Sequence, residues 1–134
     1  MAMILFVCTG NTCRSPMAAA LARLRGMDAD SAGLSAAPGA PASPGAVRAM
    51  AAYGVDLSGH RAKQVNADLI RRADRIYVMS PAHAAHLLSH FPQAAGKTHV
   101  LSPVIPDPFG QDDVTYALCA ALLISAIENA GLTG

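Results

Sequence analysis

A cysteine and an arginine with five residues between them lie near the start of the chain. The segment reads Cys8-Thr9-Gly10-Asn11-Thr12-Cys13-Arg14-Ser15. It follows the apolar residues 3–7, which are typical of a buried strand, and precedes Pro16, a residue favoured in the first turn of a helix. A helix N-terminus presents backbone N–H groups that bind anions, and an arginine adds a bidentate phosphate contact. The segment therefore predicts a phosphate-binding loop that carries a nucleophile.

The chemistry expected of this loop is nucleophilic attack on phosphorus. The helix N-terminus and the arginine favour the thiolate of Cys8, which would attack the phosphorus and form a phosphocysteine for water to hydrolyse. Arg14 would hold two phosphoryl oxygens and stabilise the charge of the transition state. Ser15 would donate a hydrogen bond to the sulfur and make it a better leaving group.

The loop also has the backbone freedom that an anion-binding turn needs, because Gly10 and Asn11 both tolerate positive φ. The expected phosphate contacts come from Thr9, Gly10, Asn11, Thr12, Cys13, Arg14 and Ser15. The Cys–Arg spacing alone is a weak signal, since a buried cysteine with a surface arginine would also satisfy it. The strand before the loop and the helix after it favour the functional interpretation.

A leaving group needs a proton, and the best donor is Asp107 in the segment 105–110. Prolines on both sides restrict the backbone and would hold the carboxyl group over the loop. An ordinary Asp-Pro turn is the alternative. Asp112 and Asp113 compete for the role, but their place before a long apolar stretch favours helix capping.

The composition limits the class of protein. The chain has 134 residues, of which 52% are apolar and 14% charged, and its net charge is +1. We expect one domain over residues 1–134 and no nucleic-acid partner, because no basic cluster stands out. The longest apolar stretch, 116–127, is too short to span a membrane and predicts a buried helix. Three cysteines and no visible leader favour the cytoplasm.

The hydrophobic pattern predicts strands at 3–7, 30–33, 75–79 and 99–101, and helices at 15–25, 43–54, 66–73, 80–91 and 113–129. Strands that alternate with helices pair in parallel through right-handed crossovers, so the fold class is α/β with helices on both faces of the sheet. In such sheets ligands bind beyond the carboxyl ends of the strands. Cys8 and the loop around Asp107 would share that edge.

Three histidines, His83, His86 and His90, follow helical spacing and would share one face. A metal or phosphate site is one interpretation. A polar stripe is the better one, because no carboxylate or cysteine lies nearby in the sequence to complete a metal site.

Residues 7–16 resemble the signature of the low-molecular-weight protein-tyrosine phosphatase family, and Asp107-Pro108 resembles its general-acid loop. Weaker similarities occur at 31–33, 60–62, 73–74 and Met79. The resemblance implies a four-stranded parallel sheet, neither metal nor cofactor, and catalysis by Cys8, Arg14 and Asp107. It implies phosphorylated proteins as substrates and inorganic phosphate as product. Cys13 matches a second loop cysteine that forms a protective disulfide with the nucleophile under oxidation.

Two residues bear on the substrate. Thr12 and Phe109 resemble the protein-arginine phosphatase branch of the family, whereas relatives acting on phosphotyrosine usually carry a bulky aliphatic residue at the position of Thr12. We therefore expect phosphoarginine as the substrate, with phosphotyrosine as the first alternative. Arsenate reduction is more remote, since only Cys119 lies late in the chain. A non-catalytic phosphate-binding module is the last alternative.

Overall fold

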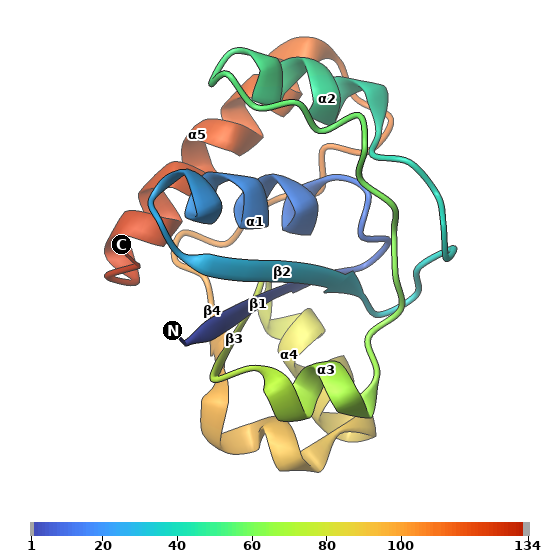
Figure 1. Cartoon of the computed structure of the whole chain (residues 1–134), viewed down its shortest axis with the longest axis vertical. Coiled ribbons are helices and arrows are strands. Elements are labelled where there is room, and N and C mark those ends of the chain that lie inside the picture. Colours follow the sequence, from blue (N-terminus) through green and yellow to red (C-terminus); the bar gives the residue numbers. More distant parts are fainter. Residues whose placement is uncertain (1, 133–134) are drawn as a thin grey trace.

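The computed structural model describes residues 2–132. Its centre is a sheet of four parallel strands in the order β2-β1-β3-β4 (Figure 1). The strands are β1 (Met3–Cys8), β2 (Asp28–Gly33), β3 (Arg75–Val78) and β4 (Thr98–Val100). The predicted fold class is confirmed. Because all strands run the same way, the carboxyl end of β1 lies on the same sheet edge as the ends of its neighbours β2 and β3.

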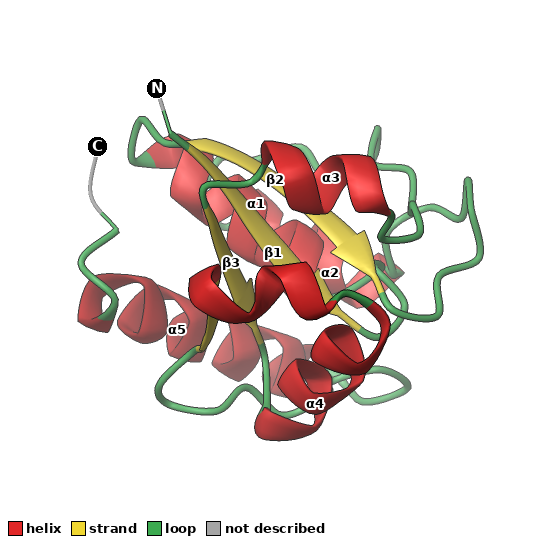
Figure 2. Ribbon diagram, turned by 90° about the horizontal axis from the view of Figure 1, so that it is seen from below, coloured by secondary structure: helices red, strands yellow, loops and turns green. Residues whose placement is uncertain are grey.

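Helices cover both faces of the sheet. They are α1 (Arg14–Leu24), α2 (Pro44–Ala51), α3 (Ala67–Arg72), α4 (Pro81–His90) and α5 (Asp113–Asn129). Figure 1 shows α1, α2 and α5 on one side of the strands, and α3 and α4 on the other. Figure 2, in which the molecule is seen from below, shows α3 and α4 in front of the sheet. A short 3₁₀ helix (Pro92–Lys97), which the sequence pattern did not predict, leads into β4.

Strand β1 is buried on both faces, as its unbroken apolar run predicts. Ile4 and Phe6 belong to the core under α1 and α5, whereas Leu5 and Val7 belong to the core under α3 and α4. Each such side chain contributes about 1.5–3 kcal/mol when it is fully buried. This alternation fixes the register of β1 and hence the position of Cys8 at its end.

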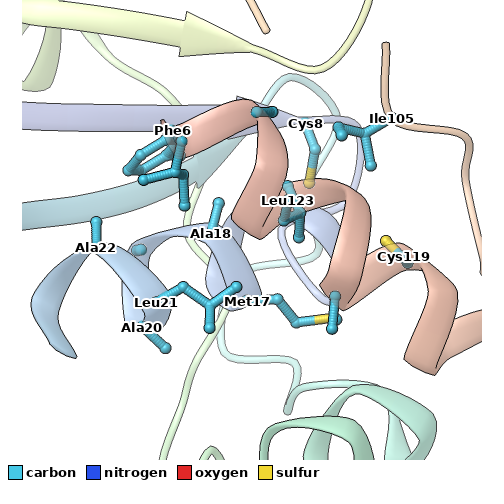
Figure 3. Packing of buried hydrophobic residues seen from close by; sticks show 14 of the residues in the cluster. Phe6, Cys8, Met17, Ala18, Ala20, Leu21, Ala22, Ile105, Cys119 and Leu123 are labelled. Atoms are coloured by element: carbon cyan, nitrogen blue, oxygen red, sulfur yellow. The ribbon is translucent and has the colours of Figure 1, made fainter. Parts of the chain in front are cut away.

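Helix α1 is buried from Arg14 to Ala22. Small residues allow this close packing: Ala18, Ala19, Ala20 and Ala22 are at most 3% exposed. Figure 3 shows Met17 and Ala18 of α1 beside Leu123 of α5. The helix is therefore clamped between sheet and α5, and its N-terminus is fixed at the carboxyl end of β1.

The helix expected to be buried over 116–127 is buried on one side only. Tyr116, Cys119 and Leu123 of α5 are buried, but Val114 and Leu118 are 67% and 60% exposed. A helix that packs on one side only must present its remaining faces to solvent. Val114 and Leu118 are apolar, yet no other segment of the described part of the chain covers them.

Candidate active site

The loop between β1 and α1 carries the predicted nucleophile at its first residue. Cys8 is the last residue of β1, and its sulfur lies 2.9 Å from Oγ of Ser15 in the first turn of α1. Cys13 is the N-cap of α1, and its side chain makes no capping hydrogen bond. The N–H groups at the start of the helix therefore remain available to an anion.

A pocket of about 290 Å³ opens over this loop. It is lined by Cys8, Thr9, Gly10, Thr12, Cys13, Arg14, Ser35, Ala37, Asp107 and Phe109. The structure thus brings the predicted nucleophile, the arginine, the predicted acid and both predicted specificity residues together. Ser35 and Ala37 are additions from the loop after β2, whose composition alone gave no sign of a role.

The side chains of two predicted phosphate-binding residues do not line the pocket. Asn11 and Ser15 are completely buried and do not line the pocket. Their side chains bond to one another beneath the loop, Nδ2 of Asn11 donating to Oγ of Ser15 at 2.8 Å. These side chains hold the loop rather than its ligand, because a side chain that faces inward to satisfy buried polar groups cannot also face the pocket.

Asn11 is the centre of this buried network. Its Nδ2 also donates to Oγ of Ser31 on β2 at 2.9 Å, and its Oδ1 accepts from the N–H of Lys63 at 3.0 Å. Nε2 of His60 lies 2.7 Å from the Asn11 carbonyl and must carry the proton, since a carbonyl only accepts. Burial lowers the pKa of His60 and so favours this neutral form. Every side-chain polar group of Asn11 is thereby satisfied.

The backbone freedom of the loop belongs to Asn11 rather than to Gly10. Asn11 has φ of 56°, whereas Gly10 is not among the residues with positive φ. A different glycine is required for close approach. A Cβ atom on Gly33, at the end of β2, would lie 2.7 Å from the carbonyl oxygen of Thr9 and 3.0 Å from the N of Asn11.

The guanidinium of Arg14 is held from several sides. Its side chain is 7% exposed, and NH1 donates to the carbonyl of Ile105 at 3.1 Å. NH2 lies 3.5 Å from Oγ1 of Thr9 and 3.7 Å from Oδ2 of Asp107. Burying a guanidinium is costly unless it is paired, and these contacts leave further N–H groups for a bound anion.

Asp107 reaches the pocket from the loop that follows β4. Its side chain is 54% exposed, and its Oδ1 accepts from the N–H of Phe109 at 3.1 Å. Phe109 is 66% exposed at the pocket rim, where its ring can contact a substrate. The two competing aspartates make other contacts. Asp112 caps α5, as the capping interpretation predicts, and Asp113 forms an ion pair with Arg48.

Cys13 is buried among hydroxyl groups. Its sulfur lies 3.0 Å from Oγ of Ser43 and 3.5 Å from the hydroxyl of Tyr116. Burial, together with the hydrogen bond to Cys13, raises the pKa of Tyr116 to about 12, so the phenol keeps its proton. All three cysteines are free thiols. Burial also raises the pKa of Cys119 to about 12, which makes that thiol unreactive.

The polar-stripe interpretation of the histidines is wrong for His83. His86 and His90 are exposed, but His83 is buried, and its Nε2 lies 2.9 Å from Oγ1 of Thr9 in the loop. The missed signal was position: His83 follows β3, and residues after neighbouring parallel strands meet at one edge. Within residues 2–132 no group of three or more His, Cys, Asp or Glu is arranged to hold a metal ion. No helix in that range is long and apolar enough to cross a bilayer.

Comparison with known proteins gives the same picture over nearly the whole chain. Residues 3–130 match the family described as low molecular weight phosphotyrosine protein phosphatase. A probable low molecular weight protein-tyrosine-phosphatase, EpsP of Ralstonia solanacearum, is 39% identical over an alignment of 131 positions, with 93% of this chain and 90% of EpsP covered. A protein-arginine-phosphatase of Geobacillus stearothermophilus is 41% identical over an alignment of 136 positions, with 94% of this chain and 91% of that protein covered.

Among solved structures, the YwlE arginine phosphatase of Geobacillus stearothermophilus superposes with a TM-score of 0.91 at 36% identity, covering 97% of this chain and 90% of that one. The chain therefore belongs to the low molecular weight phosphotyrosine protein phosphatase family of cysteine-dependent protein phosphatases.

Proposed function

We propose that the pocket hydrolyses phosphoarginine in proteins, with Cys8 as nucleophile, Arg14 as phosphate ligand and Asp107 as general acid. The observation that carries the proposal is Thr12, a small residue with a hydroxyl group that lines the pocket. It leaves space and a polar contact for a planar guanidinium group. The similarity to the protein-arginine-phosphatase of Geobacillus stearothermophilus supports the same substrate.

In the first step the Cys8 thiolate attacks phosphorus, an S–P bond forms and the P–N bond of the substrate breaks. Asp107 gives its proton to the departing nitrogen. In the second step Asp107 takes a proton from water, whose oxygen attacks phosphorus, and the S–P bond breaks. Inorganic phosphate and the thiolate result. Arg14 binds the equatorial oxygens in both steps.

The buried network supports the sulfur in this scheme. Oγ of Ser15 accepts from the Asn11 amide at 2.8 Å. Its hydroxyl proton has two acceptors within reach, the Cys8 sulfur at 2.9 Å and the Ala32 carbonyl at 3.4 Å, and the sulfur is the nearer one. Such a hydrogen bond stabilises a thiolate more than a thiol. It therefore favours the thiolate both as the attacking group in the first step and as the leaving group in the second.

Phosphotyrosine is the second candidate. The exposed ring of Phe109 and the side chain of Ala37 give the pocket apolar walls that an aryl ring can contact. EpsP of Ralstonia solanacearum, named as a probable protein-tyrosine-phosphatase, has a similar level of identity. Arsenate reduction is disfavoured, because Cys119 is buried with its pKa raised to about 12 and so cannot relay oxidation as a thiolate.

The proposal includes the cellular setting. A nucleophile that must remain a free thiolate works best in a reducing compartment, which favours the cytoplasm. The partners are then phosphorylated proteins and the product is inorganic phosphate. The net charge of +1 gives no general attraction for nucleic acid.

The test compares kcat/KM on phosphoarginine and phosphotyrosine peptides of the same flanking sequence. The wild type is compared with Thr12→Ile, which fills the pocket, and with Thr12→Val, which keeps the shape but removes the hydroxyl. We expect the wild type to prefer phosphoarginine and Thr12→Ile to reverse the preference. A loss in Thr12→Val assigns the effect to the hydroxyl rather than to space. A wild-type preference for phosphotyrosine that Thr12→Ile leaves unchanged overturns the phosphoarginine assignment.

A further inference from the structure

We propose that His83 is a positioning residue that acts through Thr9: its imidazole holds the Thr9 hydroxyl so that this group orients Arg14 and presents its own proton to the bound phosphate. The inference rests on the proposed function of the same pocket. It assigns a role to a residue on α4, which contributes no side chain to the pocket lining itself.

The contacts form a chain that ends at the arginine. Oγ of Ser80 lies 3.1 Å from Nδ1 of His83, whose Nε2 lies 2.9 Å from Oγ1 of Thr9. Oγ1 of Thr9 in turn lies 3.5 Å from NH2 of Arg14. His83 is 9% exposed, so water does not easily replace these partners. The chain links the end of β3 to the loop that follows β1.

We assign the direction of each hydrogen bond from what the groups can donate and accept. Oγ of Ser80 accepts from the backbone N–H of His83 at 3.3 Å, and its hydroxyl proton then donates to Nδ1. The proton of the neutral ring is therefore on Nε2 and is donated to Thr9. In the opposite tautomer the Ser80 hydroxyl would accept two hydrogen bonds, and its own proton would have no acceptor among the described contacts.

Thr9 is thereby left with one hydrogen-bonding group, its hydroxyl proton. A guanidinium only donates, so Oγ1 of Thr9 accepts from Arg14 as well as from His83. With both acceptor positions filled, its remaining group is the hydroxyl proton, and Thr9 lines the pocket. That proton is free to donate to a phosphoryl oxygen held by Arg14.

The surroundings keep the imidazole neutral. Burial and the charge of Arg14 lower the pKa of His83 to about 4, and His86 acts in the same direction. Asp107 opposes them, but its effect is smaller than that of burial and of Arg14. A neutral ring with one donor and one acceptor is the form that the hydrogen-bond chain requires.

Two neutral substitutions separate the two ring nitrogens. Glutamine at 83 places an amide near the position of Nε2, whereas asparagine places one near Nδ1. We measure kcat and KM with p-nitrophenyl phosphate, because its hydrolysis does not depend on which amino acid the enzyme prefers. We expect His83→Gln to keep kcat within about 2-fold and His83→Asn to lose about 10-fold, with a smaller change in KM, since the loss is one of transition-state alignment. Equal kcat values for the two variants overturn the proposal.

A double-mutant cycle tests the route through Thr9. Thr9→Val removes the hydroxyl, so adding His83→Asn to it should cost no further activity. Losses that multiply in the double variant show a role independent of Thr9 and overturn the proposal. His86→Gln, an exposed residue one turn along α4, is the matched control and should match the wild type. If His83→Asn does not fold, the comparison of Thr9→Val with Thr9→Ser decides, the serine losing less.

The inference and the proposed function fail in different ways. If the wild type hydrolyses p-nitrophenyl phosphate and the His83 variants have equal kcat values, only the role of His83 is overturned. A wild type without turnover sinks the proposed function. Orthovanadate, which mimics the five-coordinate transition state, still tests His83 in that case. It should bind His83→Asn about 10-fold more weakly than His83→Gln, and equal binding rejects the role.

Discussion

The guanidinium of Arg14 donates to the carbonyl of Ile105, which lies two residues before Asp107 and 91 residues along the chain from the arginine. One hydrogen bond therefore fixes the phosphate-binding loop relative to the loop that carries the proposed acid. Because the carbonyl belongs to the backbone, the link does not depend on the side chain at position 105. The proposed nucleophile and the proposed acid are thus linked through Arg14, the residue proposed to bind the phosphate.

Asp107→Asn is expected to lower kcat by about 100-fold or more, because an amide cannot protonate the leaving group. KM should change little, since the oxygens of the phosphate are bound by the loop and by Arg14. Steady-state kinetics on a phosphopeptide measure both constants. Asp113→Asn is the control: it breaks the exposed pair with Arg48 and should leave kcat unchanged. An Asp107→Asn enzyme with full activity would assign the proton to another donor.

Cys8→Ser is expected to abolish turnover while the loop still binds phosphate. A serine hydroxyl is not ionised at neutral pH and lacks a neighbouring base, so it cannot replace the thiolate. Calorimetric titration with inorganic phosphate measures binding, and release of phosphate from a peptide measures turnover. Residual turnover in this variant, above the level of a mock preparation, contradicts the covalent scheme.

Gly33→Ala is expected to lower both stability and kcat, although Gly33 does not line the pocket. The added Cβ atom would lie 2.7 Å from the carbonyl oxygen of Thr9, so β2 or the loop must shift. We expect a loss of about 1–3 kcal/mol in the free energy of unfolding, as overpacking usually costs, together with a lower kcat. Gly59→Ala is the control, because nothing lies within 4 Å of a Cβ atom there. Urea unfolding and kinetics compare the two, and equal behaviour would show that the loop can yield.

His83 is expected to make the protein less stable as the pH falls. Its pKa is about 4 in the folded protein, with burial and Arg14 as the main causes, against 6.5 for the ordinary side chain. Between these values the unfolded chain binds a proton that the folded one does not, so stability decreases from about pH 6.5 to pH 4 and levels off below.

The measurement is urea unfolding of the wild type and of His83→Gln at pH 7 and pH 5. The stability difference between the two should shift by about 2 kcal/mol against the wild type, while the contributions of Asp107 and the other carboxylates cancel in the comparison. A constant difference would place a charged imidazole in the folded state.

The sequence predicts most of the architecture because its signals are local. Unbroken apolar runs mark β1 and β3, and Asn66, Ser80 and Asp112 cap their helices through their side chains. The end of one strand and the start of the next helix place Cys8 and Arg14 correctly. The prolines around Asp107 likewise indicate a loop that reaches the same edge.

The remaining features depend on contacts between distant segments. Asn11 meets Ser31 and Lys63 only after β2 pairs with β1 and the loop before α3 folds back. His83 shares its helical spacing with two exposed histidines, and only the position of α4 beneath the sheet edge separates it from them. The spacing of residues along one helix cannot show which of them contacts a loop from another part of the chain.

The contact between Cys13 and Tyr116 has a consequence for the order of events at the ribosome. Cys8, the proposed nucleophile, emerges early, yet Cys13 of the same loop is packed against a residue 103 positions later. Arg14 likewise finds its backbone acceptor only after position 105 has been added. A nascent chain therefore carries its thiol long before it has an oriented guanidinium. The contacts of this loop are therefore complete only when the last helix is present.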